Sequence, residues 1–181
     1  FSETTPFTIE VWIYNTADFP AVNYDLDSIL ANKVAGSNAG YALQIGYYYD
    51  LPTYPGYMIW AGFLGGREAN TNFQVQANQW YQIAVVYNVT DFMIYVNGVA
   101  QTTTNSGSGY TASGAPLVIG KFGSDNDRYF NGTIDEVKVW NRALSKEEIK
   151  ASYNSSLQHF SRNFTNLSDG TYNYYAYTTN K

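Results

Sequence analysis

The sequence contains no cysteine, a single histidine and few charged residues, and each scarcity removes a class of function. Without cysteine, the chain forms no disulfide, no thiolate metal site and no cysteine nucleophile. Charged residues make up only 14%, and 10 basic against 15 acidic side chains give a net charge of −5. Because the sequence shows no basic cluster, we expect neither nucleic acid nor an anionic membrane as a partner. The acidic balance is compatible with calcium.

Long apolar runs and a signal peptide are missing as well. No segment approaches the roughly 18 apolar residues that a membrane-spanning helix needs, so we expect a protein that is not membrane-embedded. The sequence begins at Phe1 rather than at methionine, which indicates a fragment of a longer chain. A lack of disulfides does not exclude secretion.

Hydrophobic and aromatic residues are abundant instead. They make up 45% and 18% of the chain, and the aromatic residues include 18 tyrosines. A length of 181 residues fits one domain, or one domain with part of a neighbour. Such a tyrosine-rich, charge-poor composition is typical of extracellular β-proteins, so we predict an extracellular or cell-surface location.

Short segments in which apolar and polar residues alternate, separated by turn signals, predict two packed antiparallel sheets. We expect strands over 7–14, 28–33, 41–49, 57–64, 73–75, 80–87, 92–96, 100–104, 117–122 and 133–140. Ser145 stands three residues before Glu148, a capping box that opens one short helix over 146–153. In the last strand, alternation puts Asp135 on the same face as Val137 and Val139, unless a bulge shifts the register.

Three motifs occur in an order that resembles one family. The sequence GTIDEVKVWNRALSKEEI (132–149) resembles the closing signature of laminin-G-like, concanavalin A-like domains. FTIEVWI (7–13) resembles their first core strand, and WYQIAVV (80–86) followed by IYVNG (94–98) resembles their central hairpin. The resemblance implies an all-β antiparallel jelly-roll sandwich over residues 1–157. Residues 158–181 read as a strand pair that either links to an immunoglobulin-like module or adds strands to the jelly roll.

The same resemblance implies a structural calcium ion. In several families of this fold an aspartate of the last strand and nearby backbone carbonyls hold the ion, which would correspond to Asp135 with Asn38 and Gly40. The acidic loop residues match no EF-hand spacing; they are Asp25, Asp27, Asp50, Asp125 and Asp127. The alternative is that Asp135 accepts hydrogen bonds from backbone amides across the turn.

Aromatic residues gather around one loop and suggest a carbohydrate site. A sugar-binding groove needs flat apolar surfaces and amide or carboxylate groups. We expect four of the candidates to share the outer face of one sheet: Trp12, Gln44, Trp60 and Gln82. With the loop tyrosines, the candidate ligand-binding residues are Trp12, Gln44, Tyr48, Tyr54, Tyr57, Trp60 and Gln82. The alternative is that these aromatics pair across strands and fill the core, or form a rim for protein recognition.

The sequence shows no residue pattern typical of a catalytic site. The E-x-D-x-E arrangement of catalytic relatives is missing, and Asp135 and Glu136 are adjacent, so we expect them to face opposite sides of the strand. His159 has no serine nucleophile beside it. We predict that the protein is not an enzyme. Glycosylation sequons occur at Asn88, Asn131, Asn154, Asn163 and Asn166.

These observations predict a non-catalytic extracellular adhesion or recognition module on a calcium-stabilised jelly roll. Its partner would be a glycan or a cell-surface protein. One alternative is a structural spacer or assembly domain of a surface filament, stalk or S-layer-like protein, which would contact neighbouring domains or copies of the parent protein. Another alternative is an accessory domain of a glycosidase.

Overall fold

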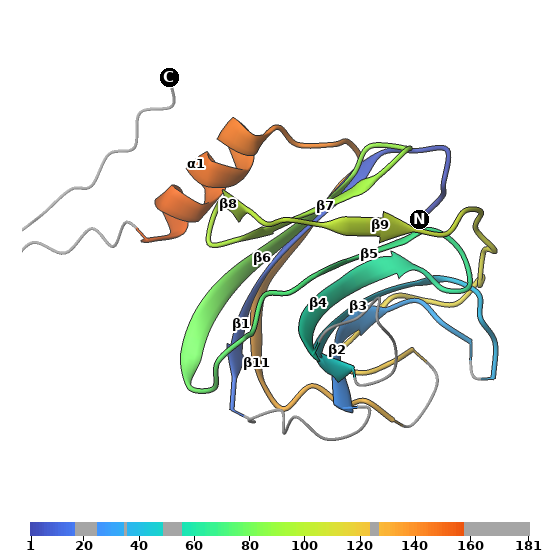
Figure 1. Ribbon diagram of the computed structural model, residues 1–181, viewed down its shortest axis with the longest axis horizontal. Helices are drawn as coiled ribbons and strands as arrows, with labels where there is room; N and C mark the ends of the chain where they lie inside the picture. Colours follow the sequence, from blue (N-terminus) through green and yellow to red (C-terminus); the bar gives the residue numbers. More distant parts are fainter. Residues whose placement is uncertain (17–24, 35, 49–55, 124–126, 158–181) are drawn as a thin grey trace, which may run out of the picture.

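The described part of the chain forms two antiparallel sheets (Figure 1). The computed structural model describes residues 1–16, 25–34, 36–48, 56–123 and 127–157. Sheet A has the strand order β11 (Gly132–Trp140), β1 (Phe7–Asn15), β6 (Gln79–Tyr87), β7 (Phe92–Val96) and β8 (Val99–Ala100). Sheet B has the order β10 (Val118–Ile119), β2 (Asp25–Ala31), β3 (Tyr41–Tyr48), β4 (Gly56–Phe63), β5 (Glu68–Thr71) and β9 (Thr104–Ser106). The predicted all-β jelly-roll sandwich with one C-terminal helix is confirmed.

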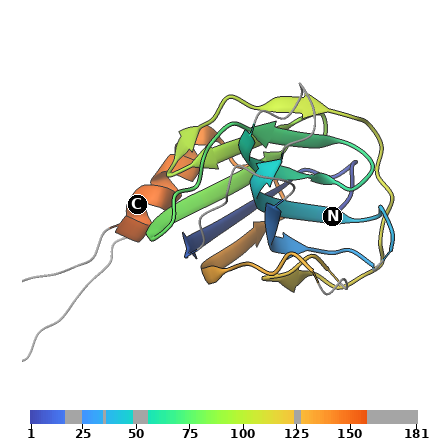
Figure 2. The same cartoon turned by 60° about the horizontal axis from the view of Figure 1, so that its bottom comes forward.

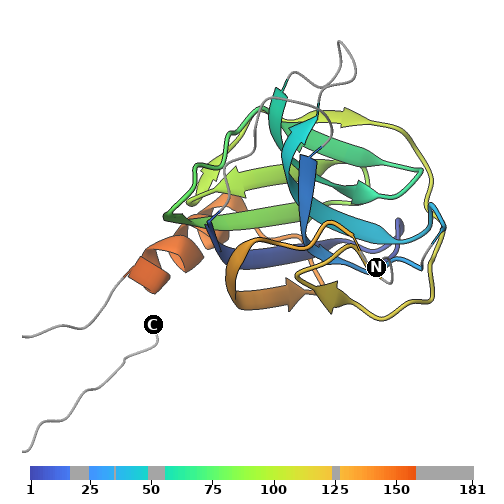
Figure 3. The same cartoon turned by 90° about the horizontal axis from the view of Figure 1, so that it is seen from below.

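The main core lies between the sheets. Alternation in β1 and β6 turns every second side chain inward, as in Ile9, Val11 and Ile83, which are fully buried. Sheet B contributes Leu43 and Ile59, which are buried in the same core. Burial of each such side chain contributes about 1.5–3 kcal/mol. Figures 2 and 3 show the same two layers from other sides.

Helix α1 (Lys146–Leu157) covers part of the outer face of sheet A (Figure 1). Ile149 and the preceding Leu144 are buried against a second apolar cluster, which includes Ala84 and Val86 of β6. The predicted capping box is confirmed, because Ser145 Oγ accepts a hydrogen bond from Glu148 N at 3.2 Å. The helix ends four residues later than the predicted 153.

Several strand predictions need correction. β2 begins at Asp25 and ends at Ala31, the predicted strand over 117–122 shrinks to β10, and 100–104 divides between β8 and β9. Residues 73–75 form no strand, whereas the short polar β5 was missed. Apolar residues signal burial rather than strand, and Val75 is buried without entering a sheet. Residues 158–181 lie outside the described residues, so their assignment stays a prediction.

A bulge in β11 changes which of its side chains reach the core. Trp12 faces Asp135, and Glu10 faces Lys138, so β11 has one residue more than β1 between these pairs. Glu136 stands at the bulge with a φ of 47°. Consequently Val137 packs against the core, whereas Asp135 is exposed. The unshifted alternation, which puts Asp135 on the face of the valines, is therefore wrong.

Candidate functional site

Two tryptophans meet on the outer face of sheet A. Trp12 of β1 is paired with Gln82 of β6 on one side and with Asp135 of β11 on the other. Tyr14, two residues further along β1, is paired with Trp80. Since the pairing is antiparallel, Trp12 and Trp80 are diagonal neighbours on one face.

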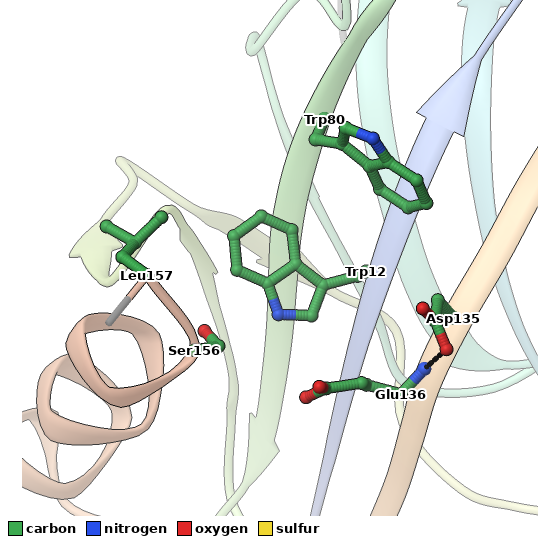
Figure 4. A pocket seen from close by; sticks show the side chains of 6 residues that line it. All are labelled: Trp12, Trp80, Asp135, Glu136, Ser156 and Leu157. Carbon is green, nitrogen blue, oxygen red and sulfur yellow. Dashed lines mark hydrogen bonds between the residues drawn. The ribbon is translucent and has the colours of Figure 1, made fainter. Parts of the chain in front are cut away.

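An open groove of about 400 Å³ lies over these residues (Figure 4). This volume falls in the range of ligand-binding clefts. Sheet A contributes one side of the groove, and the end of α1 contributes the other (Figure 4). The lining residues, which we call the sheet A groove, are Trp12, Trp80, Asp135, Glu136, Ser156 and Leu157.

The two tryptophans are held differently. The Trp12 ring stacks on Tyr153 of α1, with centroids 5.8 Å apart and planes at 21°. The rings of Trp80 and Tyr14 have centroids 5.5 Å apart and planes at 51°, and 44% of the Trp80 side chain is exposed. Trp12 is therefore fixed between sheet and helix, while Trp80 offers an accessible flat surface.

Two carboxylates stand beside the tryptophans. Asp135 Oδ1 accepts a hydrogen bond from the amide of the next residue, Glu136 N, at 2.7 Å. Glu136 Oε2 forms an ion pair with Lys138 Nζ at 2.9 Å. Both carboxylates are exposed and line the groove. The expectation that adjacent Asp135 and Glu136 face opposite sides is wrong, because the bulge turns both toward the groove.

This arrangement is suited to binding more than to hydrolysis. Glycoside hydrolysis needs two carboxyl groups that flank the scissile bond. Asp135 and Glu136 are consecutive residues of one strand and approach the groove from one side (Figure 4). Carboxylate oxygens accept hydrogen bonds from hydroxyl groups, and indole faces pack on the C–H faces of a ring.

Gln82 does not line the groove. Its side chain is 2% exposed, and its Nε2 donates to Glu10 Oε1 at 3.3 Å. Trp140 Nε1 donates to the other oxygen of Glu10 at 2.9 Å. These two hydrogen bonds compensate the burial of the Glu10 carboxyl. Gln82 therefore supports the sheet next to Trp12.

The predicted set Trp12, Gln44, Trp60 and Gln82 does not share one face. Gln44 and Trp60 pair with each other on β3 and β4 of sheet B, and they are only 3% and 8% exposed. Ser28 and Asn70 extend this row across the sheet. The prediction failed because alternation assigns a face but not a sheet. The side chains of Tyr48 and Tyr57, and all of Tyr54, lie outside the described residues.

The proposed calcium ligands belong to different parts of the sandwich. Asp135 lies in sheet A, whereas Asn38 and Gly40 precede β3 of sheet B. The Gly40 carbonyl accepts a hydrogen bond from Leu64 N at 2.9 Å. Within the described ranges, no group of three His, Cys, Asp or Glu residues is placed to hold a metal ion. Calcium binding by Asp135, Asn38 and Gly40 stays a prediction.

The described sequons are accessible. Asn88 is exposed, and its Oδ1 accepts a hydrogen bond from Thr90 Oγ1 at 2.8 Å. Asn131 and Asn154 are exposed as well, the latter on α1. Asn163 and Asn166 lie outside the described residues. Glycosylation of these sites stays a prediction.

Four residues of the sheet A groove were not among the candidates: Trp80, Glu136, Ser156 and Leu157. Trp80 could have been predicted, because it precedes the candidate Gln82 by two residues and so lies on the same face of the strand. Glu136 depends on the bulge, and the two helix residues depend on how α1 docks.

The comparisons agree with this fold. A laminin-G family model, described as the concanavalin A-like lectin/glucanases superfamily, matches residues 1–150. No curated protein matches the chain.

Solved structures share this fold, and three of them illustrate the likeness. The chain is 23% identical to a candidate carbohydrate-binding protein from Bacteroides ovatus, at a TM-score of 0.56, covering 81% of this chain and 40% of that one. It is 18% identical to domain 4 of an extracellular arabinanase from Geobacillus stearothermophilus, solved with arabinotriose, with a TM-score of 0.52 and coverages of 82% and 66%. A heptameric SAP-like pentraxin from Limulus polyphemus is 17% identical, with a TM-score of 0.60 and coverages of 83% and 70%. At these identities the likeness concerns the fold.

Proposed function

Since this chain belongs to the concanavalin A-like lectin/glucanases superfamily, we propose that it is a non-catalytic carbohydrate-binding module. The observation that supports this function best is the sheet A groove, where two tryptophans and two carboxylates line one open cavity. A pyranose needs an apolar platform for its C–H face and acceptors for its hydroxyl groups. Trp80 supplies the platform, while Asp135 and Glu136 supply the acceptors.

The fold neighbours add support of a general kind. One is described as a candidate carbohydrate-binding protein, and another was solved as an arabinanase domain with arabinotriose. The chain spans only 40% of the first and 66% of the second. We infer a module of a larger extracellular protein that works in adhesion to a glycan or to a cell-surface partner. Among the described helices, none has the length and apolarity to cross a membrane.

The accessory domain of a glycosidase is a second candidate, favoured by the likeness to the arabinanase domain. In that role the groove would bring a separate catalytic domain to its polysaccharide. Arabinotriose therefore belongs in any panel of test ligands. A spacer role would leave the groove without affinity for any glycan.

The test is calorimetric titration of the full chain with oligosaccharides chosen from a glycan array. Trp80→Ala should weaken binding by about tenfold or more, because it removes the stacking platform. Tyr129→Ala is the matched control, since Tyr129 is 55% exposed but lies outside the groove. If both variants bind like the parent chain, or if the parent chain binds no glycan, the proposed site is wrong.

A further inference from the structure

We propose that the sheet A groove prefers glycans with free amino groups, so that its ligand is a protonated amino sugar. This inference rests on the proposed function and concerns the same site. It follows from the charge of the lining, from the two tryptophans and from the backbone at Glu136.

The charge of the groove has one sign. Of the described residues that line it, Asp135 and Glu136 are charged and none is basic. Lys138 forms an ion pair with Glu136, with Nζ and Oε2 2.9 Å apart. This lysine therefore offsets the negative charge of Glu136 and not that of Asp135. A net negative groove attracts a cation and repels uronic acids or sulfated sugars.

The tryptophans add a second preference for the same ligand. An ammonium group over an indole face is attracted by the negative π-system, and tryptophan is the strongest partner of this kind. Trp12 and Trp80 both lie beside the carboxylates (Figure 4). One Asp135 oxygen is occupied by Glu136 N, and the other points to the side of the tryptophans (Figure 4). An amino sugar presents a C–H face and an ammonium group together, which matches this combination.

The backbone at Glu136 does not favour a residue with a side chain at this position. Its φ of 47° lies in the left-handed region, which disfavours residues with a Cβ and suits glycine. Glu136 nevertheless carries a carboxylate that is exposed beside Trp12 (Figure 4). We therefore expect Glu136→Gly to fold with an unchanged or higher melting temperature and to lose part of its preference for amino sugars.

The experiment compares three oligosaccharides of equal length and linkage on the full chain: glucosamine, N-acetylglucosamine and glucose oligomers. At mildly acidic pH and low salt, where the sugar amine is charged, the glucosamine oligomer should bind at least about tenfold tighter than the neutral ones. Added salt should reduce this ratio, because screening weakens exposed charge pairs.

Variants that remove one charge distinguish an effect of charge on binding from an effect on folding. Asp135→Asn and Glu136→Gln should each reduce the ratio, because each removes one negative charge and keeps an oxygen that accepts a hydrogen bond from a hydroxyl group. Lys138→Gln should raise the ratio, because it releases Glu136 from its ion pair. Glu147→Gln is the matched control, since Glu147 is an exposed carboxylate on α1 outside the groove.

Each outcome decides between the two claims. Equal affinity for aminated and neutral oligomers, with binding still sensitive to Trp80→Ala, overturns the amino-sugar preference and leaves the carbohydrate module standing. A preference for uronic acids does the same. Absence of binding to every sugar overturns both.

Discussion

The hydroxyl of Tyr41 is an unusual group in the core. The side chain is fully buried, its hydroxyl has no hydrogen-bond partner within the described residues, and burial raises its pKa above the ordinary tyrosine value. Tyr87 offers the opposite case, because its hydroxyl lies 2.9 Å from the carbonyl oxygens of both Glu3 and Val89.

We expect Tyr41→Phe to leave the free energy of unfolding unchanged or to raise it by up to about 1–2 kcal/mol, since it removes an unpaired polar group. Tyr87→Phe should lower it by about 0.5–1.5 kcal/mol through the lost hydrogen bond. Urea unfolding of both variants measures the two effects. A Tyr41→Phe variant that loses as much stability as Tyr87→Phe would show that the Tyr41 hydroxyl does have a partner.

At the scale of residues, the sequence predicts faces better than neighbours. The outward position of Trp12 and the buried position of Ile9 both follow from alternation, and both are confirmed. That Trp80 becomes the accessible member of the groove follows only from the pairing of β1 with β6. Periodicity within one strand contains no information about the strand beside it.

The start of α1 is the element with the clearest pH dependence. Two hydrogen bonds from Arg142 to the Glu148 carboxylate, at 2.9 and 2.7 Å, are the largest cause of its low pKa. The Ser145 amide, at 2.9 Å, adds to them, and the pKa falls from 4.5 to about 2.

Because the folded pKa lies below the unfolded value, this contribution to stability is present above about pH 4.5 and is lost as the pH falls through about 2. Thermal melting between these pH values should show a smaller loss of midpoint for Glu148→Gln than for the parent chain. Glu147→Gln, one residue away, should behave like the parent. NMR titration of the Glu148 carboxyl gives its pKa directly, and a value near 4.5 would contradict the capping network.

Elements whose local signals agree with their surroundings were predicted well. The capping box fixes where α1 begins, and Asn97-Gly98 fixes the β7–β8 turn, where φ angles of 51° and 72° match the requirement of a tight hairpin. The sequence does not decide whether β11 has a bulge, because the segment Asp135-Glu136-Val137 is compatible with either register. Packing of Val137 against the core selects the shifted register, and with it the carboxylates of the groove.

At the scale of the molecule, the sheet A groove exists because a helix docks on the back of a sandwich. The sequence predicts the helix but not its partner face, since docking depends on contacts with distant strands. Ile149 is fully buried against Ala84, Val86 and Tyr95 of sheet A. The same helix provides Tyr153 to Trp12 and two residues to the groove wall.

Ile149→Ala should therefore affect stability and binding together. We expect about 2–4 kcal/mol less stability, because the substitution leaves a cavity under α1. Glycan affinity should also fall at temperatures where the chain is still folded, since Trp12 loses its support.

Ile59→Val is the control: Ile59 is fully buried in sheet B, so the variant should lose about 0.5–1.5 kcal/mol of stability and bind normally. Urea unfolding and calorimetric titration of both variants provide the comparison. If Ile149→Ala binds as tightly as Ile59→Val, the helix does not shape the groove, and the ligand lies elsewhere on the sandwich.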